Sequence, residues 1–167
     1  MRAALPDLRF QGTVYRALNP LWMRTPLSGE GAKRHGGRFN PKGLAALYTA
    51  LTPEGAMAKA NQIGRPFEPV TLVAYEADLI PVLEATDPAV QVAQGIDPGV
   101  LAADDWRVQM RQDGISAGQR LAQQLIAAGW VGMIVPSFAQ GVKPGARNLV
   151  LWDWSGLRVI DNEDRLK

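Results

Sequence analysis

Short apolar or alternating runs are spaced along the chain and predict β-strands. Residues 11–16 and 46–49 form two short strand-like runs, and residues 70–77 alternate between two faces with a period of two. Farther along, residues 131–135 are apolar, and residues 147–152 are rich in Leu, Val and Trp, as is typical of strands. We expect the first three of these strands to share a sheet.

Two segments carry helix start signals. Thr52 can cap free backbone N–H groups and the proline after it suits a first helical position, which predicts a helix over residues 52–62. Ser116 and Gln119 have the spacing of a capping box, and the apolar positions that follow predict a second helix that ends at Gly129.

The middle of the chain is punctuated by Asp–Pro pairs. Asp87 and Asp97 each precede a proline, which predicts turns. Asp104 and Asp105 precede Trp106 in a segment expected to form a short helix, and we interpret the two carboxylates as helix capping and surface charge. The whole pattern predicts an α+β fold with a mixed or antiparallel β-sheet core and flanking helices.

Composition favours one soluble domain over residues 1–167. The chain has 47% hydrophobic residues, enough to bury one substantial core, and contains no internal repeat or long charged linker. Its 18 basic and 16 acidic residues give a net charge of +2, so we expect no direct nucleic-acid partner. No apolar run approaches the roughly 20 residues that span a bilayer, so we expect a cytoplasmic protein without a membrane partner.

The available side chains restrict the possible chemistry. The chain has no cysteine and a single histidine, His35, which excludes thiolate and histidine-rich metal sites. We therefore expect no metal, and catalysis must use Arg, Glu, Asp, Ser, Tyr or Lys.

A glycine-rich turn is the main candidate for binding chemistry. In residues 36–43, two successive glycines allow backbone geometry that would let N–H groups converge on an anion, while Arg38 adds a planar charged fork. This pattern predicts a phosphate site. The alternative is a sharp loop between strands, which the same Gly, Asn and Pro residues would form without a ligand.

The order of several motifs along most of the chain resembles the RES toxin family, the toxic halves of bacterial toxin–antitoxin modules. The motifs are Val14-Tyr15-Arg16-Ala17, Gly36-Gly37-Arg38-Phe39-Asn40-Pro41-Lys42-Gly43, Leu47-Tyr48-Thr49-Ala50, Thr52-Pro53-Glu54, Val135-Pro136-Ser137 and Arg147-Asn148-Leu149-Val150-Leu151. The resemblance implies a fold similar to ADP-ribosyltransferases and an enzyme that consumes NAD. It also implies an Xre-like antitoxin partner with a helix-turn-helix region.

The resemblance also implies roles for five residues. Arg16 and Arg38 match family arginines that would clamp phosphates, and Tyr48 matches a tyrosine whose ring would stack on nicotinamide. Ser137 would donate its hydroxyl to a ribose or phosphate oxygen, and Asn148 would support the site through its amide. Purely structural roles remain as alternatives: a surface ion pair for an arginine, a half-buried strand position for Tyr48, and turn bonds for Ser137 and Asn148.

The main departure from the family pattern is Lys59, which stands where the family has its catalytic glutamate. A carboxylate would stabilise the positive charge that develops on the ribose, whereas an ammonium would repel it, so we expect Lys59 to attenuate the reaction. Three explanations are open: an engineered or selected detoxified copy, which we favour, a naturally inactive homologue, or a misaligned motif.

The acceptor of the cleaved ADP-ribose is also open. Water, inorganic phosphate or a protein would each capture the same electrophilic sugar, giving hydrolysis, phosphorolysis or protein ADP-ribosylation. A different class of function is a non-catalytic module that binds nucleotides or phosphate, which Lys59 would favour.

Overall fold

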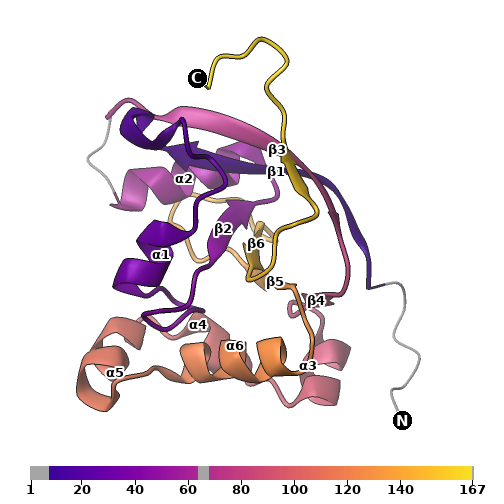
Figure 1. The fold of residues 1–167 in the computed structure, drawn as a ribbon. Coiled ribbons are helices and arrows are strands. Elements are labelled where there is room, and N and C mark those ends of the chain that lie inside the picture. The colour runs from indigo at the N-terminus through magenta and orange to yellow at the C-terminus, as the bar shows by residue number, and fades with distance from the viewer. Residues whose placement is uncertain (1–7, 64–67, 167) are drawn as a thin grey trace.

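The computed structural model describes residues 8–63 and 68–166, and its centre is one mixed β-sheet (Figure 1). The seven strands lie in the order β4-β5-β6-β2-β1-β3-β7, and only the β4–β5 pair is parallel. Their bounds are β1 Phe10–Leu18, β2 Leu47–Ala50, β3 Thr71–Leu79, β4 Val82–Glu84, β5 Gly132–Pro136, β6 Arg147–Leu151 and β7 Leu157–Val159. All five predicted strands are present, and the predicted α+β class with a mixed sheet is confirmed.

The helices lie mostly in two groups beside the sheet (Figure 1). Their bounds are η1 Pro20–Trp22, α1 Glu30–His35, α2 Pro53–Ile63, α3 Pro88–Gln94, α4 Pro98–Ala102, α5 Trp106–Asp113 and α6 Ala117–Ala127. Helix α2 packs against β1 and β2, whereas α3 to α6 gather at the other end of the sheet. Among the described residues, no helix combines the length and apolar character that crossing a membrane requires.

Both predicted helix starts are confirmed. The Thr52 hydroxyl accepts a hydrogen bond of 3.0 Å from the Gly55 amide, and Ser116 and Gln119 form the reciprocal capping box of α6. The two predicted Asp–Pro turns, in contrast, are wrong. Asp87 and Asp97 each cap the start of a helix, because an aspartate before a proline also has the right geometry to accept from the first free amides.

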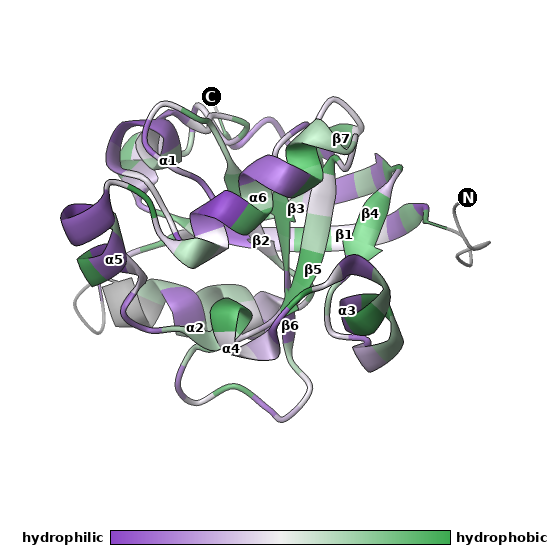
Figure 2. Ribbon diagram, turned by 90° about the horizontal axis from the view of Figure 1, so that it is seen from below, coloured by the Kyte–Doolittle hydropathy of each residue, from purple (hydrophilic) through white to green (hydrophobic). Residues whose placement is uncertain are grey.

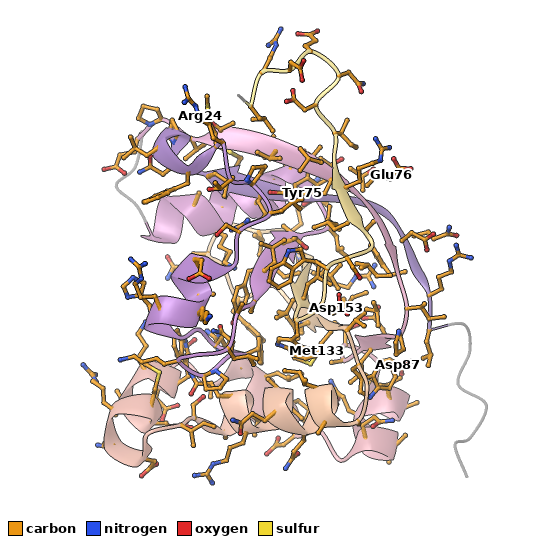
Figure 3. All side chains as sticks on the ribbon, in the orientation of Figure 1. Arg24, Tyr75, Glu76, Asp87, Met133 and Asp153 are labelled. Carbon is orange, nitrogen blue, oxygen red and sulfur yellow. The ribbon has the colours of Figure 1, made fainter. Side chains whose placement is uncertain are left out.

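Two apolar cores hold the sheet. Strand β3 shows the alternation plainly in Figure 3, where Tyr75 points into the molecule and Glu76 points away from it. Met133 of β5, also labelled in Figure 3, belongs to the core that α6 covers with Ala122 and Leu125. In Figure 2, apolar and polar residues alternate in bands along α6, as expected for a helix that covers a core with one face.

The sheet is nearly divided between β1 and β2. Strand β1 pairs with β3 along its whole length, and β2 pairs with β6 along its whole length, but β1 and β2 share only the Tyr15–Ala50 register pair. The two halves of the sheet therefore diverge beside α2. This divergence leaves room for side chains of β1, β2 and α2 to face open space.

Candidate functional site

Two adjoining cavities lie where the sheet divides. The first, of about 360 Å³, lies between the glycine turn, α5 and the loop after β5. The second, of about 270 Å³, lies between β1, β2, α2 and the segment before α1. Ala32, Tyr48 and Lys59 line both cavities, so these three residues form the boundary between them.

Three backbone amides of the glycine turn, including those of both successive glycines, are used within the protein. The N–H groups of Gly36, Gly37 and Phe39 donate to Ala32 O at 2.8 Å, Asn40 O at 2.9 Å and the Tyr48 hydroxyl at 3.0 Å, respectively. The prediction of a backbone cradle for an anion is therefore wrong. The Arg38 and Lys59 side chains supply positive charge at this cavity instead.

The carbonyl groups of the same turn are held by residues from distant parts of the chain. The buried Gln119 amide donates to Gly37 O at 2.9 Å and Asn40 O at 3.1 Å, and Trp152 Nε1 donates to Phe39 O at 2.9 Å. The sequence predicted only a capping role for Gln119 and only a strand position for Trp152. The turn is thus a rigid support whose conformation depends on α6 and on the end of β6.

Tyr48 connects this support to the cavities. Its hydroxyl donates to Asn40 Oδ1 at 2.6 Å and accepts from the Phe39 amide, and burial raises the pKa of this phenol well above its usual range. A Cβ at Gly37 would lie 2.6 Å from the Tyr48 oxygen and 2.5 Å from Asn40 Oδ1, which explains the glycine. The hydroxyl serves the turn, and the ring borders both cavities.

Arg38 lines the first cavity and is fixed in place by carbonyl groups. Its Nη1 donates to Ala103 O at 2.7 Å and to Leu101 O at 3.3 Å, and its guanidinium lies 5.1 Å from the centre of the Phe138 ring. It also pairs at 3.3 Å with Asp104, whose side chain is 92% exposed, so that ion pair adds little stability. Arg38 therefore makes the surface ion pair of the structural alternative and also lines the cavity.

The two adjacent aspartates before α5 differ from their sequence interpretation. Asp104 carries surface charge, as predicted, although it is paired with Arg38. Asp105 occupies the N-cap position of α5 but accepts no capping hydrogen bond, and it accepts from the Gln109 side chain instead. The capping interpretation of Asp105 is therefore wrong.

Arg16 lines the second cavity from β1. Its Nη1 donates to Pro26 O at 3.0 Å, and the Tyr75 hydroxyl donates to the same oxygen at 2.6 Å. Strand β1 and the segment before α1 are joined by these bonds. Arg16 is thus half-buried and oriented, with its positive charge on the opposite cavity from Arg38.

Lys59 of α2 lies between the two arginines and borders both cavities. Its ammonium lies 4.5 Å from the centre of the Tyr48 ring, and it makes no hydrogen bond or ion pair with a described residue. Burial, reinforced by the positive charges of Arg16 and Arg38, lowers the Lys59 pKa to about 8. None of the described residues that line either cavity is acidic.

Asn148 supplies an unused acceptor at the first cavity. Its Oδ1 is buried and has no hydrogen-bond partner among the described residues. Buried polar atoms without a partner are uncommon in folded proteins, because such an atom loses its bond to water and gains none. The atom is therefore suited to accept from a ligand N–H or O–H group.

Ser137 lies outside these two cavities. It lines a separate hollow with residues of the loop before β6, and its hydroxyl accepts a 3.4 Å bond from Ala139 N. Its chain neighbours Pro136 and Phe138 do line the first cavity. The structure thus brings together Arg16, Arg38, Tyr48, Lys59 and Asn148, and places Ser137 on the other side of the segment that borders them.

Comparisons with known proteins extend the geometric picture. A family model described as the RES domain matches residues 13–166. The NAD(+) phosphorylases MbcT of Mycobacterium bovis (strain ATCC BAA-935 / AF2122/97) and of Mycobacterium tuberculosis (strain ATCC 25618 / H37Rv) are each 31% identical over 137 residues, which cover 75% of this chain and 74% of theirs.

One similar solved structure is the crystal structure of the M. tuberculosis MbcT–MbcA toxin–antitoxin complex. It superposes with a TM-score of 0.64 at 22% identity, covering 92% of this chain and 84% of that chain. At this level of identity the superposition shows a shared fold.

Proposed function

Since this chain belongs to the RES domain family, we propose that its two adjoining cavities form the NAD site of a toxin whose reaction breaks the nicotinamide–ribose bond. The observation that carries the proposal is the convergence of Arg16, Arg38, Tyr48 and Asn148 around these cavities. Similarity to NAD(+) phosphorylases favours inorganic phosphate as the acceptor over water or a protein.

Each of these residues meets one chemical need of such a ligand. The guanidinium groups of Arg16 and Arg38 would pair with the pyrophosphate, because their forks match phosphate oxygens. The Tyr48 ring would lie against the nicotinamide ring. Asn148 Oδ1 would accept from the carboxamide or from a ribose hydroxyl, and Ser137 would reach the ligand through a rearrangement of its loop.

Lys59 would slow the reaction. Breaking the glycosidic bond creates positive charge on the ribose, and the described residues that line the cavities offer one ammonium and three guanidinium groups, those of Arg16, Arg38 and Arg107, but no carboxylate. Removing one well-placed electrostatic group in an enzyme typically costs about 10²–10³ in rate, and a charge of the wrong sign adds repulsion. We therefore propose that this copy is attenuated.

The test is nicotinamide release from NAD by purified protein, with and without inorganic phosphate. We expect Lys59→Glu to release nicotinamide roughly 10²–10³ times faster than the unchanged protein, and faster with phosphate present. Lys59→Met removes the positive charge without adding a carboxylate, and so separates the effect of charge removal from that of the carboxylate. Its rate of nicotinamide release should increase far less than that of Lys59→Glu. Lys33→Glu, at an exposed position outside both cavities, is the control. Release by Lys59→Glu no faster than by the control would contradict the proposal.

A second candidate function is a nucleotide-binding module without turnover, which the absence of a described acidic lining residue favours. Under that function, Lys59→Glu would lose affinity for NAD without releasing nicotinamide. Calorimetric binding measured beside the release assay separates the two functions.

We further propose a cytoplasmic location and an Xre-like helix-turn-helix antitoxin as partner. The solved MbcT–MbcA complex, whose toxin chain shares this fold, supports an antitoxin partner. Co-expression with the product of the neighbouring gene, followed by affinity purification, tests this pairing. Recovery of the toxin alone would count against it.

A further inference from the structure

The Lys59 side chain is partly buried, and its ammonium has no counter-ion among the described residues. The titratable or charged side chains placed against it are Arg16 of β1, Arg38 of the glycine turn and Tyr48 of β2, and none of them is an anion. A buried charge of this kind is costly unless it is paired. The ligand that best relieves this cost is an anion that reaches all three cations.

The position of Lys59 over the Tyr48 ring has a second consequence. Aromatic faces attract cations, and the ammonium already lies 4.5 Å from the ring centre. The oxidised nicotinamide ring of NAD is itself positively charged, so it would compete with Lys59 for Tyr48. It would also be repelled by a cluster of three cations.

We propose that Lys59 makes this site selective for nucleoside diphosphates that lack a cationic ring, so that ADP-ribose binds more tightly than NAD in its oxidised form. The phosphate groups would bridge the two cavities and contact Lys59 together with Arg16 and Arg38. The inference rests on the proposed function only in using the same cavities. Lys59 acts here as a specificity-determining residue.

Calorimetry at pH 7 with three ligands tests the selectivity. ADP-ribose lacks the nicotinamide ring, oxidised NAD carries it with a positive charge, and reduced NADH carries a ring of similar size without that charge. For the unchanged protein, we expect ADP-ribose to bind at least about tenfold more tightly than oxidised NAD. NADH should lie close to ADP-ribose. NADH affinity as weak as that of oxidised NAD would overturn the proposal, because ring size would then explain the exclusion.

Variants test the assignment to Lys59. Lys59→Met should weaken ADP-ribose binding roughly 10- to 100-fold, as loss of a charge-assisted contact does, and should bring ADP-ribose and oxidised NAD to similar affinities. The matched control Lys33→Met, at an exposed lysine outside both cavities, should change neither affinity. An unchanged ratio of the two affinities in Lys59→Met would overturn the proposal.

Two further measurements test the site: a titration with inorganic phosphate, and the number of protons taken up when ADP-ribose binds. Titration with inorganic phosphate alone separates a simple phosphate site from one that needs the nucleotide, and the proposal requires ADP-ribose to bind more tightly. At pH 8, where Lys59 is about half protonated, ADP-ribose binding should take up at most about half a proton, seen as a dependence of the heat on the ionisation enthalpy of the buffer, and Lys59→Met should abolish this uptake. Proton uptake that persists in that variant would contradict the assignment.

The outcome is independent of the nicotinamide-release assay. Release by Lys59→Glu without ligand selectivity in the unchanged protein would refute this inference and leave the proposed function intact. Selectivity that depends on Lys59, without nicotinamide release by any variant, would support this inference and contradict the proposed function.

Discussion

Removal of the Tyr48 hydroxyl tests whether that group supports the glycine turn or contacts the ligand. Tyr48→Phe keeps the ring but deprives the Phe39 amide of its acceptor and Asn40 Oδ1 of its donor. Both residues are buried, with Asn40 fully so. Each buried polar group left without a partner costs about 1–3 kcal/mol, so for two such groups we expect the free energy of unfolding to fall by about 2–6 kcal/mol.

The assay is equilibrium unfolding in urea, followed by tryptophan fluorescence, with the slopes of the transitions compared between proteins. Tyr15→Phe is the control, because the structure gives the Tyr15 hydroxyl no hydrogen bond with a described residue, and it should shift stability by less than about 0.5 kcal/mol. A similarly small change for Tyr48→Phe, together with a large loss of ADP-ribose affinity, would refute the reasoning and assign the hydroxyl to the ligand.

Three further predictions concern the support of the site and its charge. Gly37→Ala should lower the melting temperature by several degrees, because the new Cβ would lie 2.5 Å from Asn40 Oδ1. Gly31→Ala, whose Cβ would meet open space, is the control and should leave the melting temperature unchanged. Equal melting temperatures for the two variants would contradict this prediction. Gln119→Leu should destabilise the protein by about 2–6 kcal/mol in urea unfolding, since it leaves two carbonyls of the turn without a donor. A loss no larger than that of one helix cap would count against the link between α6 and the turn. Folding lowers the pKa of Lys59 to about 8, so between pH 8 and about 10.4 the unfolded chain holds more protons than the folded protein. The free energy of unfolding, relative to that of Lys59→Met, should therefore rise by about 1–2 kcal/mol from pH 7 to pH 9.5. A difference that does not change with pH would exclude a perturbed amine.

The elements that the sequence predicted are those with local signals. The capping residues Thr52 and Ser116 lie within three positions of the amides they bond, so their helices were predictable. Strand β4 was not, because its three residues gain strand structure only by parallel pairing with β5, about fifty positions later. Asp87 and Asp97 show the remaining ambiguity, since one dipeptide suits both a turn and a helix start.

The site divides in the same way. The family resemblance pointed to Arg16, Arg38, Tyr48 and Asn148, and the structure gathers all four around adjoining cavities. The supporting contacts of the turn could not be predicted, because Gln119 and Trp152 reach it across 82 and 113 positions in the chain.

The same limit applies to Ser137. The pattern alone grouped it with the other residues, but the path of the chain places it in a neighbouring hollow. The order of motifs along the chain indicates which residues a family uses. Which of these residues line the same cavity depends on how distant segments pack.

A crystal structure of the unchanged protein with ADP-ribose at pH 7 tests the central claim most directly. We predict one molecule of ADP-ribose extending through both cavities, with phosphate oxygens within hydrogen-bond distance of Lys59 and at least one of the two arginines. Ligand bound elsewhere on the protein, or within one cavity with Lys59 still over Tyr48 and without a phosphate contact, would contradict the account.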